Sequence, residues 1–410
     1  MITNIFKNNI WLYLLFLFIP ILNVYSFGVG NIALIALLLV AIYGLISGNV
    51  FKKQKLFLFL GFLVIFHEAI FYVMYNVPKT SGTWFNRIVE ELLFVISIAT
   101  FVNVFDLGKL YKWWRLVGVL FMLGLFYHSI EYYVFNHNVD MIKLPFLPLS
   151  DNKVFEKILT VDYTRPRSFF TEPSHYASFM LPLLFLNLLY KDYKYGAINM
   201  VFLLLSTSSL GIVTGAFFLI VMSFKHTSFK IKLLLIIFLI IGYFCFLNMD
   251  IFQYARDKIA TSNGGDESSS LRLFFTASVW AELPIDLKIL GIPNFSIGDF
   301  LLQNSKYIPN QLVWVLQDES SINYASSFWF VAVKFGFVVW IVYLFFYIRN
   351  IQKSWSSPIL YYALMIFVAT FIQSCFLNSI FMSQIVLMLV LLNNKKYIDE
   401  KYNCNNVIRK

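Results

Sequence analysis

Apolar runs about as long as a membrane-spanning helix alternate with short polar breaks along almost the whole chain. A helix that crosses the hydrocarbon core of a bilayer needs about 20 mostly apolar residues. The pattern therefore predicts an all-α fold. Helices are expected at residues 9–26, 29–47, 56–76, 87–105, 115–135, 174–190, 197–208, 210–224, 232–248, 326–348, 357–373 and 376–393, where the short pair 197–208 and 210–224 also fits one longer helix.

The composition indicates that lipid is the solvent of this chain. Hydrophobic residues make up 59% of the 410 residues and charged residues only 13%, whereas a soluble domain carries about 25% charged residues. The first apolar run follows Lys7 and lacks an Ala-x-Ala-like cleavage site, so we expect a retained helix and not a removed signal peptide. We expect a single integral membrane domain over residues 1–410, a polytopic helical bundle of about 12 transmembrane helices.

Lysine and arginine residues lie at the ends of the apolar runs and do not gather on one surface, so the net charge of +10 does not indicate nucleic-acid binding. Short basic clusters occur at residues 52–55, 109–115, 191–194, 225–232, 349–353 and 395–396. Cytoplasmic loops of membrane proteins are enriched in such residues. Twelve helices with both termini in the cytoplasm place every cluster on that side, provided that the chain turns at Ser206–Ser209 and near Gln373–Ser374.

The same arrangement places three polar segments on the outer, periplasmic side. The segment at 77–87 is short, whereas the other two run over residues 136–173 and 249–325. Loops of this length in a compact protein are usually functional. We therefore expect the chemistry of the chain where these two long loops meet the membrane.

The segment that leads from the first long loop back into the membrane combines charged residues with a helix start. It reads Arg-Pro-Arg-Ser-Phe-Phe-Thr-Glu-Pro-Ser-His-Tyr-Ala-Ser-Phe over residues 165–179. Pro173 suits the first position of a helix, which makes Glu172 the expected cap and places His175 on the same face. A helix N-terminus attracts anions, and Arg165 and Arg167 lie just upstream to bind phosphate oxygens. This predicts an anion site with a candidate acid–base pair; the alternative is an interfacial helix cap whose arginines extend to the membrane surface.

Arg272, in the second long loop, is the other candidate for anion binding. It lies near the start of an expected amphipathic helix with apolar residues at helical spacing, namely Leu271, Phe274, Phe275 and Val279. We expect this helix to lie along the membrane surface and to present Arg272 to an anion. The alternative is a solvated arginine on a surface helix.

Ionisable residues also occur inside the expected helices. His67 and Glu68 lie midway along the third apolar run, and Lys334 lies within another. Charged groups at such depth are costly and usually face the interior of the bundle. We expect a structural polar pair that includes Lys334, with a role in lining a cavity as the alternative.

Other charged residues lie near the outer ends of the fourth and fifth apolar runs. Glu90 and Glu91 closely follow Arg87, and His128 precedes Glu131 by three residues. Residues three or four apart share one face of a helix. These spacings predict local pairs.

Three stretches of the chain resemble parts of a known family. Residues 165–177 are similar to the Arg-x-x-Ser-Phe-Phe-x-Glu-Pro-x-x-x-Ala signature of bacterial O-antigen and capsular-polysaccharide polymerases, within the O-antigen polymerase–ligase superfamily. Residues 270–280, followed by Ile-Leu-Gly-Ile-Pro at 289–293, resemble the Arg-x-x-x-Trp and Leu-Gly-x-Gly region of its large outer loop, with a longer spacing to Trp280. Residues 323–336 resemble the region that enters the following helix.

The resemblance implies a membrane glycosyltransferase of the GT-C type in the bacterial inner membrane. Such a polymerase transfers a growing glycan from undecaprenyl diphosphate onto the next lipid-linked repeat unit, and a chain-length regulator membrane protein is an expected partner. The related O-antigen ligases, our first alternative, usually carry a histidine before the helix that follows the large loop. Residues 318–323 here read Asp-Glu-Ser-Ser-Ile-Asn, which favours the polymerase. Many members also carry an arginine where this chain has Ser209, and this departure weakens the phosphate contact expected there.

Glycosyl transfer from a diphosphate requires stabilisation of the leaving group and removal of a proton from the acceptor hydroxyl. We assign the first role to Arg165, Arg167 and Arg272, and the second to Glu172 or His175. The sequence contains no Asp-x-Asp motif, so we expect a metal-independent reaction without a cofactor. The second alternative is a lipid-linked glycan flippase, which the long loop at 249–325 disfavours.

Overall fold

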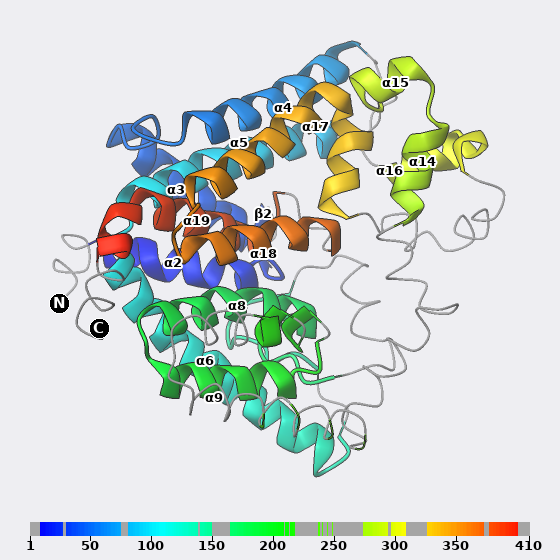
Figure 1. Cartoon of the computed structure of the whole chain (residues 1–410). Helices are drawn as coiled ribbons and strands as arrows, with labels where there is room; N and C mark the ends of the chain where they lie inside the picture. The colour runs from blue at the N-terminus through cyan, green and yellow to red at the C-terminus, as the bar shows by residue number, and fades with distance from the viewer. Residues whose placement is uncertain are drawn as a thin grey trace.

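Helices dominate the computed structural model of the chain (Figure 1). It describes residues 9–27, 30–74, 81–137, 140–149, 165–208, 210–212, 214–217, 237, 240, 244, 248, 274–293, 297–308, 326–372 and 377–400. The helices are α2 (Ile10–Leu22), α3 (Ile32–Ile46), α4 (Lys55–Met74), α5 (Ser81–Val104), α6 (Leu107–Tyr133), α8 (Pro173–Leu189), α9 (Tyr193–Leu205), α14 (Thr276–Glu282), α15 (Ile285–Leu290), α16 (Ile297–Gln303), α17 (Ser327–Lys353), α18 (Ile359–Ile372) and α19 (Ser379–Asn393). A short antiparallel ribbon, β1 (Ser26–Phe27) with β2 (Gly30–Asn31), and the 3-10 helix η4 (Ser305–Tyr307) complete the described elements. The predicted all-α class is confirmed.

The expected apolar runs coincide with helices wherever the chain is described. Three helices are clearly longer than expected: α6 begins at Leu107, before the expected 115–135, α5 begins at Ser81, before the expected 87–105, and α17 continues to Lys353, beyond the expected 326–348. The described residues within the expected helices 210–224 and 232–248 are helical. The total of twelve membrane crossings stays a prediction.

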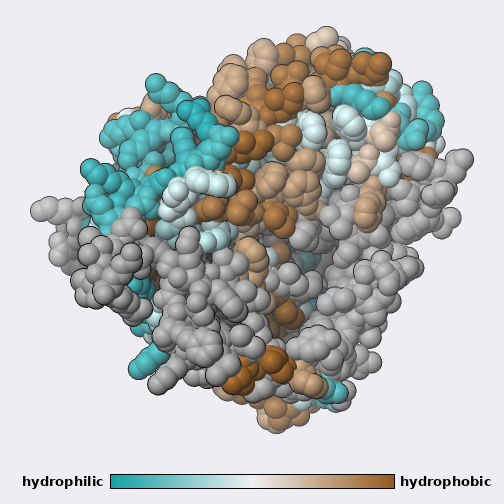
Figure 2. Space-filling view, viewed as in Figure 1, coloured by the Kyte–Doolittle hydropathy of each residue, from teal (hydrophilic) through white to brown (hydrophobic). Residues whose placement is uncertain are grey.

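Three of the described helices, α4, α6 and α17, are long and apolar enough to cross a membrane. Their outward faces carry large hydrophobic side chains that are at least 44% exposed, including Phe59, Phe62 and Phe66 on α4 and Leu116, Leu120 and Leu123 on α6. In Figure 2, hydrophobic side chains cover the middle of the face in view, and hydrophilic ones gather on the side where α2 begins and α19 ends. Apolar surface of this extent is unusual in water and expected in lipid. The structure is therefore consistent with a helical membrane protein.

The basic clusters lie together at one end of the bundle. Hydrogen bonds connect the chain segments that carry them: Gln54 Nε2 donates to Asn393 Oδ1 at 2.9 Å, and Lys395 Nζ donates to the carbonyl of Lys353 at 2.7 Å. Other contacts of this end are Tyr13–Asp106, Asn49–Asn103 and Arg115–Asp192. The clusters at 52–55, 109–115, 191–194, 349–353 and 395–396 thus share one side, as the sequence predicts, while the cluster at 225–232 lies outside the described residues. The assignment of that side to the cytoplasm stays a prediction.

Helix α8 forms the interior of the bundle. Nearly all of its side chains are buried, and it packs against α6, α9 and α19. A helix that is apolar on every face belongs in the core of a protein and not at its surface. Because neighbouring helices contact α8 on several sides, its first turn is fixed in position. The segment that precedes this turn is therefore attached to a fixed point.

A second, smaller core joins the segment that contains α14 and α16 to the start of α17. Phe275, which precedes α14, and Val279 within it are buried against Ile292, Phe300 and Val333. The described part of the predicted amphipathic segment contains the short helix α14, but Phe274 is 65% exposed and does not share its buried face. Arg272 and Leu271 lie outside the described residues.

α17 is bent where the chain after α15 crosses it. Gly336 has φ 74° and ψ 177°, a conformation within the helix that is accessible almost only to glycine. The crossing chain contributes Gly291, and the backbone N–H of Ile292 donates to the carbonyl of Val333 at 3.2 Å. A Cβ atom on Gly336 would collide with the carbonyl oxygen of Ile289. The expectation of one regular helix over 326–348 is therefore wrong at this point, because the crossing backbone requires the bend.

Replacement of Gly336 with alanine is expected to lower the stability by about 1–3 kcal/mol, because alanine strongly disfavours this conformation and its Cβ would strike Ile289. The apparent melting temperature of the detergent-purified protein measures the effect. Gly108→Ala is the matched control, since its added Cβ would meet only the Asp106 side chain, at 3.4 Å. Equal melting temperatures for the two variants would contradict the role of Gly336.

Candidate functional site

The candidate site begins at the first turn of α8. The helix starts at Pro173, as the sequence predicts, and Glu172 occupies the cap position with φ −138° and ψ 151°. The Glu172 side chain nevertheless makes no capping hydrogen bond. Its Oε2 atom instead accepts a hydrogen bond from Ser174 Oγ at 2.8 Å. The predicted position is confirmed and the predicted capping bond is wrong, because the carboxylate turns to Ser174 and away from the helix amides.

Glu172 and His175 lie side by side at the surface. Their Oε2 and Nε2 atoms are 4.0 Å apart, and the side chains are 40% and 32% exposed. Thr171 Oγ1 and His175 Nδ1 are hydrogen-bonded at 2.7 Å, which orients the imidazole. The prediction that this pair shares one face is confirmed. An accessible carboxylate beside an oriented imidazole is an arrangement suited to accepting a proton from a bound hydroxyl.

Arg165 reaches the turn that follows α9. Its Nη1 atom donates to the carbonyl oxygen of Thr207 at 3.3 Å. The turn itself was predicted at Ser206–Ser209, and it is present: α9 ends at Leu205 and helical structure resumes at residue 210. The turn therefore lies beside the segment at 165–172, at the end of α8 remote from the basic clusters.

Arg167 lies behind this surface. It is only 4% exposed, and its Nη1 atom donates to the carbonyl of Thr171 at 2.8 Å. Its Nη2 atom lies 3.9 Å from Asp140 Oδ1, and Nε and Nη2 make no hydrogen bond with any described residue. Buried polar groups normally have such partners. Two donor atoms of Arg167 therefore keep their hydrogen-bonding capacity within the part of the chain that the structure describes.

Burial lowers the pKa of the Arg167 guanidinium from its ordinary value. The carboxylates of Asp140 and Glu172 act in the opposite direction, and Arg165 adds to the lowering. The pKa of an arginine starts far above neutral pH, so Arg167 keeps its charge there. The site therefore holds the buried Arg167 cation beside the exposed carboxylate of Asp140.

His128 of α6 connects two loop segments at this site. Its Nδ1 atom accepts the backbone N–H groups of Ser168 at 3.1 Å and Arg167 at 3.4 Å. Its Nε2 atom is hydrogen-bonded to the carbonyl of Asp140 at 2.6 Å. The sequence predicted a local pair of His128 with Glu131, whereas the hydrogen bonds of the ring go to backbone groups far along the chain. No spacing in the sequence could reveal Asp140 or this use of His128, because the three segments meet only in the folded chain.

The segment is also held at Ser168. This residue has a left-handed φ of 58°, and its Oγ atom donates to the carbonyl of Phe121 at 2.9 Å. Gly124 of α6 permits the approach, since a Cβ atom there would lie 2.6 Å from Ser168 Oγ. A serine in this conformation is uncommon and requires support from its surroundings. Here the support comes from α6.

A second buried polar cluster joins α4, α5 and α17. Lys334 Nζ and Glu68 Oε1 are 2.9 Å apart, and both side chains are completely buried. Trp84 Nε1 donates to Glu68 Oε2 at 2.6 Å, and His67 Nε2 is hydrogen-bonded to the carbonyl of Leu290 at 2.7 Å. The predicted polar pair with Lys334 is confirmed, with Glu68 as the partner. His67 instead attaches α4 to the end of α15.

The remaining local pairs lie near the ends of α5 and α6. Arg87 Nε and Glu91 Oε1 are 3.2 Å apart, as the spacing predicted. Glu131 pairs with His137, with 2.9 Å between Oε2 and Nδ1. In both pairs, the two residues are close to one another in the sequence.

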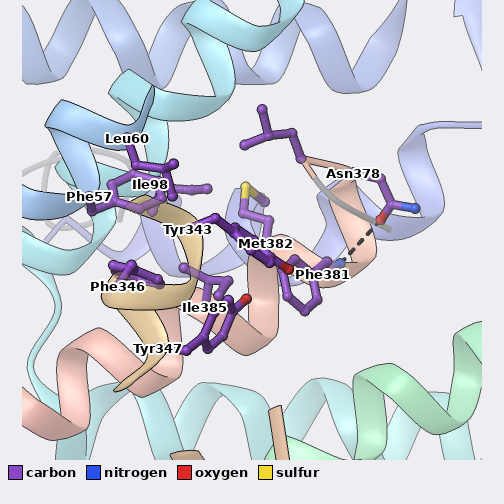
Figure 3. A pocket seen from close by; sticks show the side chains of 11 residues that line it. Phe57, Leu60, Ile98, Tyr343, Phe346, Tyr347, Asn378, Phe381, Met382 and Ile385 are labelled. Carbon is purple, nitrogen blue, oxygen red and sulfur yellow. Dashed lines mark hydrogen bonds between the residues drawn. The ribbon is translucent and has the colours of Figure 1, made fainter. Parts of the chain in front are cut away.

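An apolar cavity of about 20 Å³ lies between α4, α17 and α19 (Figure 3). Phe57, Leu60, Tyr343 and Met382 are among its lining residues. A volume of this size has room for about one water molecule and none for a sugar unit.

Comparison with known proteins gives no relative for this chain. No family model matches it, and the searches of curated proteins and of solved structures give no significant match.

Proposed function

We propose that this chain is a polysaccharide polymerase that joins undecaprenyl-diphosphate-linked repeat units at the outer face of the bacterial inner membrane. The observation that supports this most is the meeting of Arg165, Arg167, Glu172 and His175 at the first turn of α8. The other end of α8 leads to Asp192, which pairs with Arg115 among the basic clusters. With those clusters and both termini in the cytoplasm, the candidate site faces outward.

The arginines provide the charge that a diphosphate needs. Guanidinium groups donate several hydrogen bonds in a fixed plane that matches phosphate oxygens. Arg167 keeps two donors without hydrogen-bond partners among the described residues, and the N-terminus of α8 adds the positive end of a helix dipole. Arg272 is the third proposed contact.

The proposed reaction breaks one bond and forms one. An acceptor hydroxyl oxygen attacks the anomeric carbon of the growing glycan, and the bond from that carbon to the diphosphate oxygen breaks. The electron pair leaves with undecaprenyl diphosphate, whose negative charge the arginines stabilise. The hydroxyl proton passes to Glu172 or His175, whose exposed side chains lie on the open side of the site. No cofactor enters this scheme, and a chain-length regulator membrane protein is the proposed partner.

Deletion of the gene from a cell that makes the glycan distinguishes the candidate classes. Loss of a polymerase is expected to leave single repeat units on the cell surface, seen as one band above the unmodified acceptor on gels. Loss of a ligase would leave polymer that is not attached to its acceptor, and loss of a flippase would leave no repeat units at the surface. Either of these two results would contradict the polymerase proposal.

A further inference from the structure

His128 has a hydrogen-bond arrangement that only one form of the imidazole can satisfy. The N–H groups of Arg167 and Ser168 point at Nδ1, and a backbone N–H can only donate. Nδ1 must therefore carry a lone pair. The Asp140 carbonyl can only accept, so Nε2 must carry the hydrogen in its 2.6 Å bond. The ring is neutral, with its proton on Nε2.

This one ring fixes the two segments that form the arginine site. The 140 segment supplies the carboxylate nearest Arg167, and the 167–168 segment supplies the backbone that carries its side chain. Ser168, held in a left-handed conformation, also links the two segments, because its carbonyl accepts the backbone N–H of Ile142 at 2.9 Å. Loss of the Nδ1 lone pair would leave two buried N–H groups facing a third N–H, which removes two hydrogen bonds and adds a repulsion.

The charged groups around His128 belong to its own helix and to both segments. On α6, Glu131 is paired with His137. The 140 segment carries Asp140 and Lys143, and the segment leading to α8 carries Arg165, Arg167, Glu172 and His175. Asp140 and Arg167, which carry opposite charges, both belong to the segments that the ring binds through their backbone.

We propose that His128 is a positioning residue that must stay neutral for the 165–170 segment to keep the conformation that presents Arg167. A proton on Nδ1 then releases the segment, which makes the site sensitive to acidification of the outer side. The structural part of this proposal stands without the polymerase assignment; its consequence for glycan transfer rests on the proposed function.

Hydrogen–deuterium exchange of the full-length protein in lipid nanodiscs tests the structural part. The peptide that covers residues 165–170 is followed between about pH 7.5 and 5, the range in which a histidine usually gains its proton. After correction for the intrinsic effect of pH, exchange of this segment is expected to rise about tenfold in the wild type, as two hydrogen bonds are lost. His128→Asn offers an acceptor oxygen that does not titrate, so its exchange is expected to be independent of pH; His128→Gln serves if that variant does not fold. His137→Gln is the matched control at an exposed histidine of the same end and is expected to behave as the wild type.

The outcomes separate the two proposals. Wild-type exchange that does not respond to pH, or a response that persists in His128→Asn or His128→Gln, would overturn the role of His128. Suppose that exchange responds as expected and that the same nanodiscs elongate lipid-linked repeat units. The wild-type transfer rate should then fall at acidic pH, and this fall should be absent in the variant that lost the exchange response. An unchanged fall in that variant would overturn the link to activity. Exchange that responds in a protein with no transfer activity at any pH would count against the polymerase and leave the positioning role in place.

Discussion

Arg167→Ala is expected to reduce the long glycan ladder to single repeat units. A donor that stabilises charge developing in the transition state contributes about 10²–10³-fold to the rate. Arg167 is placed for this role because two of its donors have no hydrogen-bond partner among the described residues. Arg167→Lys keeps the charge but not the planar fork, so we expect short chains from it as well. Gels of the glycan from complemented deletion cells, with equal amounts of protein in the membrane, give the measurement.

The matched control for this prediction is Lys143→Ala. Lys143 is a cation of the same loop region, 3.9 Å from the Asp140 carboxylate, but its side chain is 50% exposed. We expect a normal ladder from it. Glu172→Ala is expected to shorten the chains too, through loss of the carboxylate beside His175. A normal ladder from both Arg167→Ala and Glu172→Ala would remove these residues from the proposed site.

Lys334→Met is expected to destabilise the protein by about 3–5 kcal/mol, because it leaves the Glu68 carboxylate buried without its counter-charge. The double variant Glu68→Gln with Lys334→Met removes both charges and keeps an acceptor for Trp84 Nε1. We expect it to recover most of the lost stability, since a neutral replacement of a buried pair is often tolerated. Melting temperatures in detergent and the yield of folded protein measure both effects.

The Arg115–Asp192 pair provides a comparison at the basic end of the bundle. Its side chains are 39% and 25% exposed, so its electrostatic contribution is screened by solvent. We expect Asp192→Asn to cost about 1 kcal/mol or less. If Lys334→Met were no more damaging than this variant, or if the double variant were the least stable of the three, the buried pair would not have the structural role assigned to it.

The parts of the fold that depend on local pattern could be predicted from the sequence. The apolar runs gave the helices, Pro173 marked the start of α8, and the basic clusters that the structure describes do lie at one end. A pair between Lys334 and the His67–Glu68 stretch was predictable because charges inside apolar runs have few other ways to be accommodated, and the structure identifies Glu68 as the partner. The bend at Gly336 was missed, because its cause is the backbone at Gly291, which reaches α17 from a distant part of the chain.

In the candidate site, too, features that depend on local spacing were predictable, and features that depend on distant segments were not. The spacing of Glu172 and His175 on one helical turn was predictable, and the structure places them 4.0 Å apart. The burial of Arg167 was not predictable, because it depends on Asp140 and His128, which come from other segments. The absence of a capping bond from Glu172 depends on the rotamer that Ser174 stabilises, which residue types alone do not reveal.

We propose that the chain itself elongates a lipid-linked glycan, and reconstitution of the purified protein measures this activity in isolation. The purified protein is placed in liposomes with labelled undecaprenyl-diphosphate-linked repeat units and no other enzyme. We predict a ladder of products spaced by one repeat unit, with one undecaprenyl diphosphate released per transfer, and no ladder from Arg167→Ala. Repeat units that are only moved across the bilayer, or transferred only to a separate acceptor without elongation, would contradict the account.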